Sequence, residues 1–364
     1  MDNPLKYFAE LRDPRVERNR EHLLEEILLI AIAAVLSGAE SWNDIAQYGE
    51  EKREWLQTFL TLPSGIPSHD TFNRVFAALD PEEMEKGFVA WVSSIAKLTA
   101  GEVVAIDGKT LCGTREAGKK RLVHMVSAWA EGNGLVLGQR KVEEKSNEIT
   151  AIPRLLDALK LAGTVVTIDA MGCQREIAKL IIEKKADYVL AVKDNQGHLL
   201  EGVKDSFQML AADEVAEEID CGHGRAERRR CTVIADLSLL EDAAKWPSLQ
   251  GLVRIESERH HKVSGKIERE IRYYITSLRP DAARLNGVIR QHWGIENKLH
   301  WVLDVGFGED LDRKRAGDAA ENFSVLNRIA LNLLKQEKST QRGIKGKRLK
   351  AAWNNNYLLH LLGI

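Results

Sequence analysis

Two short apolar segments, each followed by an aspartate, constrain the fold of this chain more than any other feature. Residues 103–106 lead into Asp107, and residues 165–168 lead into Asp169. Short apolar runs bounded by turn residues are typical of buried strands, and the carboxyl ends of strands in an α/β sheet line the crevice where ligands bind. One such aspartate alone is more often a helix cap or a salt-bridge partner. Because an unpaired buried carboxylate is strongly unfavourable, two on neighbouring strands favour a shared metal site.

The pattern around these aspartates predicts a mixed α/β sheet. We expect strands at 103–106, 122–130, 135–142, 165–168 and 188–192, and helices at 148–160 and 174–185. The first three strands are close enough in sequence for antiparallel hairpins, whereas helical crossovers imply parallel pairing of the later strands. The resulting order, β-β-β-α-β-α-β, is the order of ribonuclease H-like folds, which end with one further helix.

The remaining segments divide the chain further. We predict a helical N-terminal domain (1–100), a core (101–193 and 281–338), a β-rich insertion (194–280) and a basic C-terminal tail and helix (339–364). Within them we expect insertion strands at 230–236, 252–261 and 267–277, a core helix at 281–303 and a docking helix at 318–338. The N-terminal domain could bind DNA or brace another domain, and the sequence does not decide between these roles.

The predicted core helix carries a candidate third acid. His292, Glu296, His300 and Asp304 follow one another at intervals of four residues and therefore share one face. This stripe could itself hold zinc, but the H-E-x-x-H spacing is absent, and carboxylate-rich sites prefer hard cations such as Mg²⁺ or Mn²⁺. We expect Glu296 to join the two aspartates as a ligand. The histidines would contact phosphate or orient the carboxylates, although ordinary packing explains them more simply.

The charge distribution indicates local basic surfaces on an acidic background. The net charge of −2 argues against a uniformly basic nucleic-acid-binding coat. Between residues 313 and 350, however, eleven Lys and Arg stand against three acids, and a second basic cluster comprises Arg225, Arg228, Arg229 and Arg230. Segregated basic segments fit a polyanion-binding face, and a solvated helix surface would have the same composition.

Cysteine usage predicts a reducing compartment, and hydropathy predicts a protein without a membrane-spanning helix. The four cysteines form no CxxC pair and have no zinc-site spacing. The longest apolar run, residues 27–36, is shorter than the roughly 20 residues that a membrane-spanning helix requires. The first residues lack the charged and apolar regions of a signal peptide. We expect a cytoplasmic protein with no membrane partner.

Five longer motifs along the chain are more specific than any single residue. They are PSHDTF at 67–72, IDGKT at 106–110, EKSNEI at 144–149, TIDAMGCQ at 167–174 and HWGIEN at 292–297. Together they make the chain resemble the H-repeat-associated family of insertion-sequence DDE transposases, nearly end to end. The resemblance implies a ribonuclease H-like core with Asp107, Asp169 and Glu296 as an acidic triad, interrupted by a β insertion before the glutamate.

The resemblance implies DNA transposition by two-metal phosphoryl transfer. Two Mg²⁺ ions about 3.5–4 Å apart, for which Mn²⁺ could substitute, would activate a water or a DNA 3′-hydroxyl and stabilise the leaving oxygen. Asp107 would bridge both ions, while Asp169 and Glu296 would hold one each. The expected partners are double-stranded DNA, as element ends and as target, and a second copy of the chain, since a synaptic complex holds two ends.

Side chains near the motifs and in the basic segments are candidate DNA ligands, because cations position phosphates and aromatic rings stack on unpaired bases. The candidates are Lys109, Lys145, Asn147, Gln174, Lys193, Arg225, Arg228, Arg229, Arg230, Arg290, His292, Trp293, Asn297, Lys298, His300, Lys345, Lys347 and Arg348. In the wider superfamily a Tyr-x₂-Arg-x₃-Glu-x₆-Lys signature surrounds the glutamate. Alignment on Glu296 places Ile289, His292 and Leu303 at the tyrosine, arginine and lysine positions.

Two other functions would use the same features. A hydrolytic nuclease on the same core would cleave phosphodiesters without joining them. A catalytically silent relic of an element would bind DNA and do nothing more.

Overall fold

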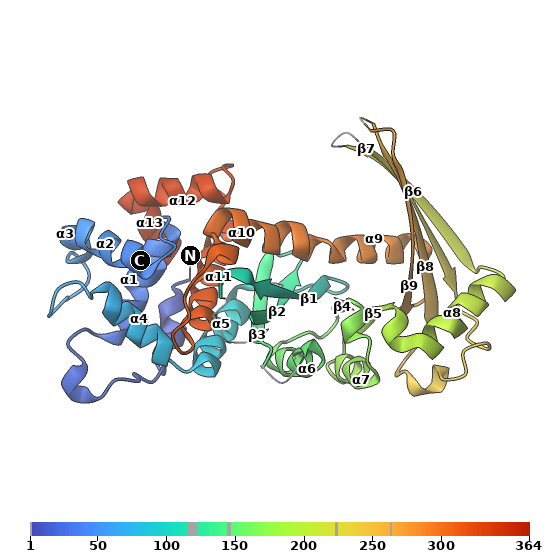
Figure 1. Ribbon diagram of the computed structural model, residues 1–364, viewed down its shortest axis with the longest axis horizontal. Coiled ribbons are helices and arrows are strands. Elements are labelled where there is room, and N and C mark those ends of the chain that lie inside the picture. The colour runs from blue at the N-terminus through green and yellow to red at the C-terminus, as the bar shows by residue number, and fades with distance from the viewer. Residues whose placement is uncertain (1, 115–121, 144–146, 223–224, 263) are drawn as a thin grey trace.

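One mixed sheet runs through the protein, whose computed structural model describes residues 2–114, 122–143, 147–222, 225–262 and 264–364. The strand order in these segments is β3-β2-β1-β4-β5-β9-β8-β7-β6 (Figure 1). The first five strands are β1 (Val103–Leu111), β2 (Val123–Ala130), β3 (Leu135–Lys141), β4 (Val165–Ile168) and β5 (Asp187–Val192). With α6 (Glu148–Ala158) and α7 (Arg175–Glu183), they follow the predicted β-β-β-α-β-α-β order.

The pairing of these strands also agrees with the prediction. β1 pairs antiparallel with β2, and β2 with β3, whereas β1–β4 and β4–β5 are parallel. β1 is longer than the predicted 103–106, because its polar second half keeps its register with β2, with Gly108 opposite Val126 and Thr110 opposite His124. That half is only partly buried, so its composition carries no buried-strand signal.

The strands of the predicted insertion continue the same sheet. β9 (Ile267–Thr276) pairs antiparallel with β5, and β8 (Gly251–His261), β7 (Arg225–Ile234) and β6 (Glu214–Gly222) follow outward. Their outer ends rise away from the rest of the protein (Figure 1). These four strands therefore extend the core sheet beyond β5.

Neither the outermost strand β6 nor the preceding helix α8 (Gly197–Met209) was predicted. β6 is exposed along almost its whole length and has no apolar face to signal a strand. Its pairing is supported by charge, because Glu217 faces Arg230 of β7 and is ion-paired with the neighbouring Arg228 at 2.8 Å. Opposite charges at facing positions stabilise strand pairs, and charged side chains on an edge strand discourage pairing with other chains.

Helices cover both faces of the core sheet. α9 (Ala282–His292) lies on one face, where Leu285 joins a buried apolar cluster with Val165, and α6 and α7 lie on the other (Figure 1). The chain then continues through a π-helical turn (Ile295–His300) into α10 (Trp301–Phe307). The apolar spacing predicted one regular helix here, because it carries no signal for the wider turn. Such π turns are frequent at functional sites.

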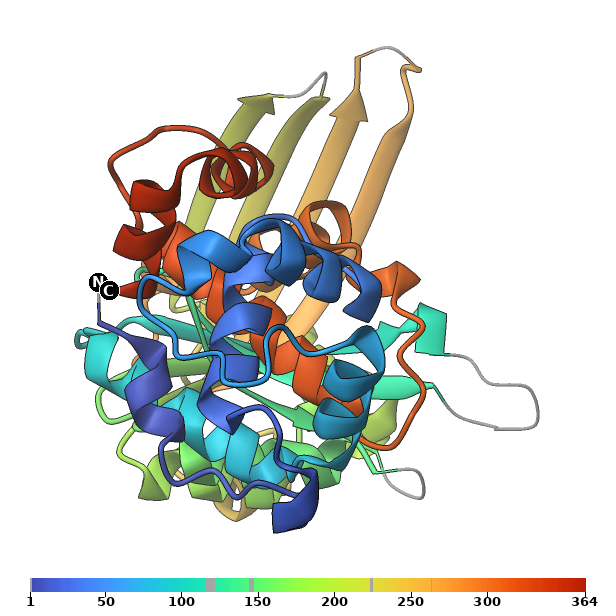
Figure 2. The same cartoon turned by 90° about the vertical axis from the view of Figure 1, so that its left-hand side faces the viewer.

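The N-terminal residues form a helical layer at one end of the molecule, which faces the viewer in Figure 2. Its helices are α1 (Leu24–Leu36), α2 (Trp42–Glu51), α3 (Arg53–Leu56), α4 (His69–Ala78) and α5 (Pro81–Ile95). α11 (Ala319–Gln336), which coincides with the predicted docking helix, contacts α1, α4, α5 and β3. It therefore joins the helical layer to the sheet.

The basic C-terminal segment folds into two docked helices, α12 (Ile344–Trp353) and α13 (Asn355–Leu362). Arg348 is buried, and its Nε and Nη2 donate to the carbonyl oxygens of Val35 and Ala39 at 3.0 and 3.1 Å. The same guanidinium also bonds the Gly306 carbonyl. Arg348 therefore joins α12 to the end of α1 and to the end of α10.

No helix in the described ranges combines the length and the hydropathy that crossing a membrane demands. The four cysteines are free thiols, with Cys173 and Cys231 buried.

We predict that Arg348→Met lowers the free energy of unfolding by at least about 3 kcal/mol, because it leaves several buried carbonyls without a donor. Lys345→Met is the matched control, since Lys345 is an exposed cation on the same helix, and it should change stability by no more than about 0.5 kcal/mol. Urea denaturation monitored by circular dichroism measures both. Equal effects of the two substitutions would contradict the anchoring role of Arg348.

Candidate active site

The two aspartates that follow the apolar segments lie at the same edge of the sheet. Asp107 is in β1, and Asp169 follows β4, which pairs parallel with β1. Asp169 also caps the next turn by accepting a hydrogen bond from the backbone N–H of Met171 at 3.0 Å. Both carboxylates line a cavity of about 410 Å³, together with Glu296 from the π-helical turn. The cavity therefore gathers all three predicted acids.

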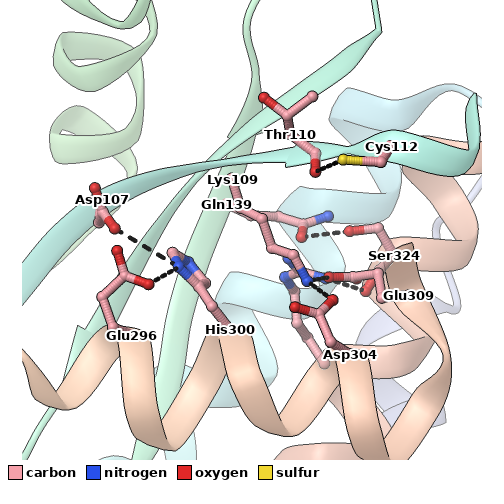
Figure 3. A network of polar contacts seen from close by, with 11 residues as sticks. Asp107, Lys109, Thr110, Cys112, Gln139, Glu296, His300, Asp304, Glu309 and Ser324 are labelled. Carbon is pink, nitrogen blue, oxygen red and sulfur yellow. Dashed lines mark hydrogen bonds and ion pairs between the residues drawn. The ribbon is translucent and has the colours of Figure 1, made fainter. Parts of the chain in front are cut away.

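His300 lies between two of these acids. Its Nδ1 is 3.6 Å from a carboxylate oxygen of Asp107 and 3.5 Å from one of Glu296 (Figure 3). The three residues offer ligand atoms that all lie within 4.8 Å of one another. The Nε2 atom of His300 is buried and has no hydrogen-bond partner among the described residues. His300 therefore faces the acids through one nitrogen only.

The crowding of carboxylates perturbs their ionisation. Burial, followed by the neighbouring Glu296, raises the pKa of Asp107 to about 8. Hydrogen bonding to His300 is the main cause that lowers the pKa of Glu296, to about 2. Burial, followed by the charge of Glu148, raises the pKa of Asp169. Buried like charges of this kind repel one another, and a hard divalent cation, which prefers oxygen ligands, would relieve the repulsion. The residues present therefore fit such a cation.

The predicted stripe of four residues separates into distinct environments. His292 is hydrogen bonded through Nδ1 to the Thr167 hydroxyl at 2.9 Å. Burial lowers the pKa of His292 to about 4, which keeps the ring neutral at pH 7. Asp304 pairs with Lys109, away from the carboxylates of Asp107 and Glu296 (Figure 3). Only Glu296 and His300 of this stripe approach Asp107.

Lys109 belongs to a buried ionic network next to the cavity (Figure 3). It is paired with Asp304 of α10, and its Nζ is 3.3 Å from Glu309. Glu309 in turn binds Arg328 of α11 at 2.6 Å, and both of these side chains are fully buried. The network therefore connects the strand that carries Asp107 to the helix that follows Glu296, and Lys109 points into the protein.

Other DNA-ligand candidates near the cavity occupy different settings. Lys193 is exposed and lines the cavity, and its charge partly offsets the rise in the pKa of Asp169. Trp293 also lines the cavity, with the Arg272 guanidinium 4.4 Å from its ring centroid. The Gln174 side chain accepts a hydrogen bond from the Gln196 amide at 3.3 Å. Lys193 and Trp293 are thus the candidates that line the cavity, together with His292.

The candidates on the next turns of the helix make local contacts. Lys298 is ion-paired with Glu131, and Asn297 donates to the Trp293 carbonyl oxygen at 3.0 Å. Gly294 permits this arrangement, because a Cβ atom there would lie 2.8 Å from the carboxyl carbon of Glu131. Asn147 caps α6 by accepting from the backbone N–H of Ile149 at 3.1 Å.

The arginines of the insertion divide between the two faces of the outer sheet. Arg228 pairs with Glu217 at 2.8 Å, and Arg230 is exposed. Arg229 is buried on the opposite face. Arg290 of α9 is paired with Glu218 and Asp220 of β6. Lys145 and the side chain of Arg225 lie outside the described residues.

The candidates at the C-terminus also differ in exposure. Lys345 is exposed, whereas Lys347 is buried and donates to the Leu334 carbonyl oxygen at 2.8 Å. Arg348 is buried among carbonyls in the same way, as described above. Lys347 and Arg348 are therefore engaged inside the protein, and of the three only Lys345 faces solvent.

Sequence reasoning missed two neighbours of the site, Glu148 and His124. The carboxylate of Glu148 accepts a hydrogen bond from His124 Nε2 at 2.6 Å, and its charge acts on Asp169. Glu148 lies within one of the quoted motifs, at the start of the first crossover helix. The signal that could have identified Glu148 is its place in this motif, because the first residue of a crossover helix lies near an edge of the sheet.

Two family models and several known proteins are similar to this chain. Residues 99–333 match the family model described as "Transposase DDE domain", and residues 5–92 match the model described as "DDE_Tnp_1-associated". The protein named "Putative transposase YncI" of Escherichia coli O157:H7 is 41% identical over 98% of this chain and 94% of its own length. The protein named "H repeat-associated putative transposase YhhI" of Escherichia coli K12 is 38% identical over 98% and 97%.

A shorter relative differs in its stated activity. The protein named "Inactive transposase YbfQ" of Escherichia coli K12 is 48% identical, over 15% of this chain and 64% of its own length. The full-length similarities, however, span the helical layer, the sheet and the C-terminal helices together. This chain belongs to the family of DDE transposases.

Proposed function

We propose that this insertion-sequence transposase cuts and joins DNA at the cavity lined by Asp107, Asp169 and Glu296. The observation that carries the proposal is the convergence of these three carboxylates, from two strands and the covering helix, on one cavity. Carboxylates in such a cluster are suited to holding hard divalent cations, and such cations promote phosphoryl transfer.

The cations that best suit this donor set are Mg²⁺ and, as a substitute, Mn²⁺. Asp107 would hold both, while Asp169 and Glu296 would hold one each. When bound, two such cations make a water or a DNA 3′-hydroxyl more acidic and stabilise the leaving oxygen.

The neighbouring side chains would orient the acids and the DNA. His300 contacts Asp107 and Glu296 through one nitrogen, and so fixes the two carboxylates relative to each other. Neutral His292, anchored on Thr167, can donate to a phosphate without adding charge. Exposed Lys193 would position the phosphate that reacts.

The sheet supports a ribonuclease H-like core for this reaction. The order β3-β2-β1-β4-β5 supports this proposal, since β1, β4 and β5 are parallel to one another and β2 is antiparallel to its neighbours β1 and β3. We propose the core at 101–193 and 281–338, the helical domain at 1–100, the insertion at 194–280 and the C-terminal helices at 339–364.

The DNA surface that we propose uses the exposed candidates. Besides Lys193 it includes Trp293, Arg230 and Lys345, whereas Lys109, Lys347 and Arg348 serve the internal structure. The DNA would comprise element ends and target, bound by a homodimer so that two ends react together. The reaction would take place in the cytoplasm, where bacterial DNA lies.

A hydrolytic nuclease and a silent relic are the alternatives, and the family match and the full-length relatives favour neither. An in vitro assay with labelled element ends separates them. A strand-transfer product indicates a transposase, nicking alone a nuclease, and a mobility shift without cleavage a relic.

Asp107→Asn should reduce cleavage of labelled element ends by about 1000-fold or more, because the loss of metal-based stabilisation amounts to at least about 4 kcal/mol. It should also reduce the rise in melting temperature that Mg²⁺ produces in the wild-type protein by mass action. Asp205→Asn, at an exposed position of α8, is the control and should behave as wild type. Full cleavage by Asp107→Asn would contradict the proposed site.

The effect of Mg²⁺ should increase with pH. Because the folded-state pKa of Asp107 is raised to about 8 and the unfolded one is about 4, the folded state holds an extra proton between these values. This group therefore lowers the free energy of unfolding as pH rises from about 4 to about 8, and cation binding must release the proton. The Mg²⁺-induced rise in melting temperature should be larger at pH 8 than at pH 6, and an equal rise would contradict this assignment.

Lys193→Ala should weaken DNA binding to a similar extent for all sequences. If Lys193 contacts one phosphate, the slope of log affinity against log salt concentration should decrease by about 0.9. Lys179→Ala, which removes an exposed lysine paired with Glu183 on α7, is the control. Fluorescence anisotropy at several salt concentrations measures both slopes, and an unchanged slope for Lys193→Ala would exclude that contact.

A further inference from the structure

Glu148, the first residue of α6, lies against the strand that carries Asp107. A Cβ atom on Gly108 would lie 2.7 Å from the carboxyl carbon of Glu148 and 2.5 Å from Nε2 of His124. Gly108 is in a regular strand and its φ is not positive, so the backbone does not require glycine there. Glycine at 108 instead provides the space in which the Glu148 carboxylate approaches β1, one residue from Asp107.

His124 fixes the orientation of this carboxylate. His124 Nε2 is 2.6 Å from Oε1 of Glu148, and its Nδ1 is 2.8 Å from the hydroxyl of Thr110. Thr110 and His124 face each other in the register of β1 and β2. Glu148 is mostly buried, with 17% of its side chain exposed, so the chain from Thr110 through His124 to Glu148 is anchored on the sheet.

The position of Glu148 is not explained by capping of its own helix. Asn147 already caps α6 through its side chain. Within the described ranges, the ion-pair partner of Glu148 is His124. The negative charge of Glu148 is also the strongest charge acting on Asp169, where it raises the pKa. Glu148 therefore adds repulsion at the edge of the sheet where Asp107 and Asp169 already lie.

We propose that Glu148, held by His124, is a fourth carboxylate of the divalent-cation site formed by Asp107, Asp169 and Glu296. It reaches the site from the layer of α6, whereas Glu296 comes from the covering helix on the other face of the sheet (Figure 1). Mg²⁺ keeps several bound waters in protein sites, and an oriented carboxylate beside the ligands accepts hydrogen bonds from them. The inference rests on the proposed function and adds a residue to its metal site.

The test measures Mn²⁺ binding to the full-length, DNA-free protein by calorimetry. Glu148→Gln should weaken Mn²⁺ binding about tenfold. Glu176→Gln is the matched control, because Glu176 is an exposed glutamate in the first turn of the other crossover helix, and it should bind as wild type. Unchanged Mn²⁺ affinity in Glu148→Gln would overturn the proposal.

Melting in EDTA distinguishes a metal-site role from a structural one. Removal of a negative charge that repels Asp169 should leave the metal-free melting temperature of Glu148→Gln unchanged or higher. A lower melting temperature with wild-type Mn²⁺ affinity would mean that Glu148 is a structural residue and would overturn the proposal. Gly108→Ala, which displaces the same carboxylate while keeping all four acids, should also weaken Mn²⁺ binding.

Asp107→Asn separates this inference from the proposed function. If Asp107→Asn loses Mn²⁺ binding while Glu148→Gln keeps it, the three-carboxylate site holds and the fourth carboxylate is rejected. If Asp107→Asn binds Mn²⁺ as wild type, the proposed site itself is rejected and the inference with it.

Discussion

Repulsion among carboxylates at one edge of the sheet is the constraint on which the rest of this structure depends. Parallel pairing of β1 with β4 brings Asp107 and Asp169 together, and the π-helical turn adds Glu296. Burial and like charge raise the pKa of both aspartates, so the metal-free arrangement is electrostatically unfavourable. The surrounding structure must therefore hold these groups in place against a force that separates them.

Two sets of contacts oppose the repulsion between the carboxylates. His300 lies between Asp107 and Glu296, and it stabilises the charged form of the glutamate. The buried network of Lys109, Glu309 and Arg328 then connects β1 to α11. Because α11 also contacts the N-terminal helices, the site is joined to both layers of the protein, and removal of one member would leave a buried charge unpaired.

Residue composition overstates the basic surface of this chain. The segment 313–350 is rich in Lys and Arg, yet Arg328, Lys347 and Arg348 are buried and bonded to carbonyls or acids. Their methylene stems pack and their charged ends donate. The sequence does not distinguish a Lys or Arg that caps a helix end inside the protein from one that contacts a phosphate. Burial separates them, and burial follows from how α12 docks.

The sequence by itself determined the local order of the core and its acids. Short apolar runs predicted β1, β4 and β5 and made the aspartates within β1 and after β4 candidates, and a spacing of four residues placed Glu296 on one helix face with two histidines. That these three acids form a triad was implied by the family resemblance. The physical reason is that buried strands and helix faces require apolar residues at regular, closely spaced positions, so they are visible in the local sequence.

Only the tertiary structure decided which distant residues meet. It extended the core sheet with β9, β8, β7 and the acidic edge strand β6, and it turned Lys109 inward to Asp304. It also placed Glu148 against β1 through the space at Gly108. These outcomes depend on charge pairing across strands and on packing between layers, which join residues far apart in the chain. Such contacts leave no periodic pattern, so they cannot be obtained from a single sequence.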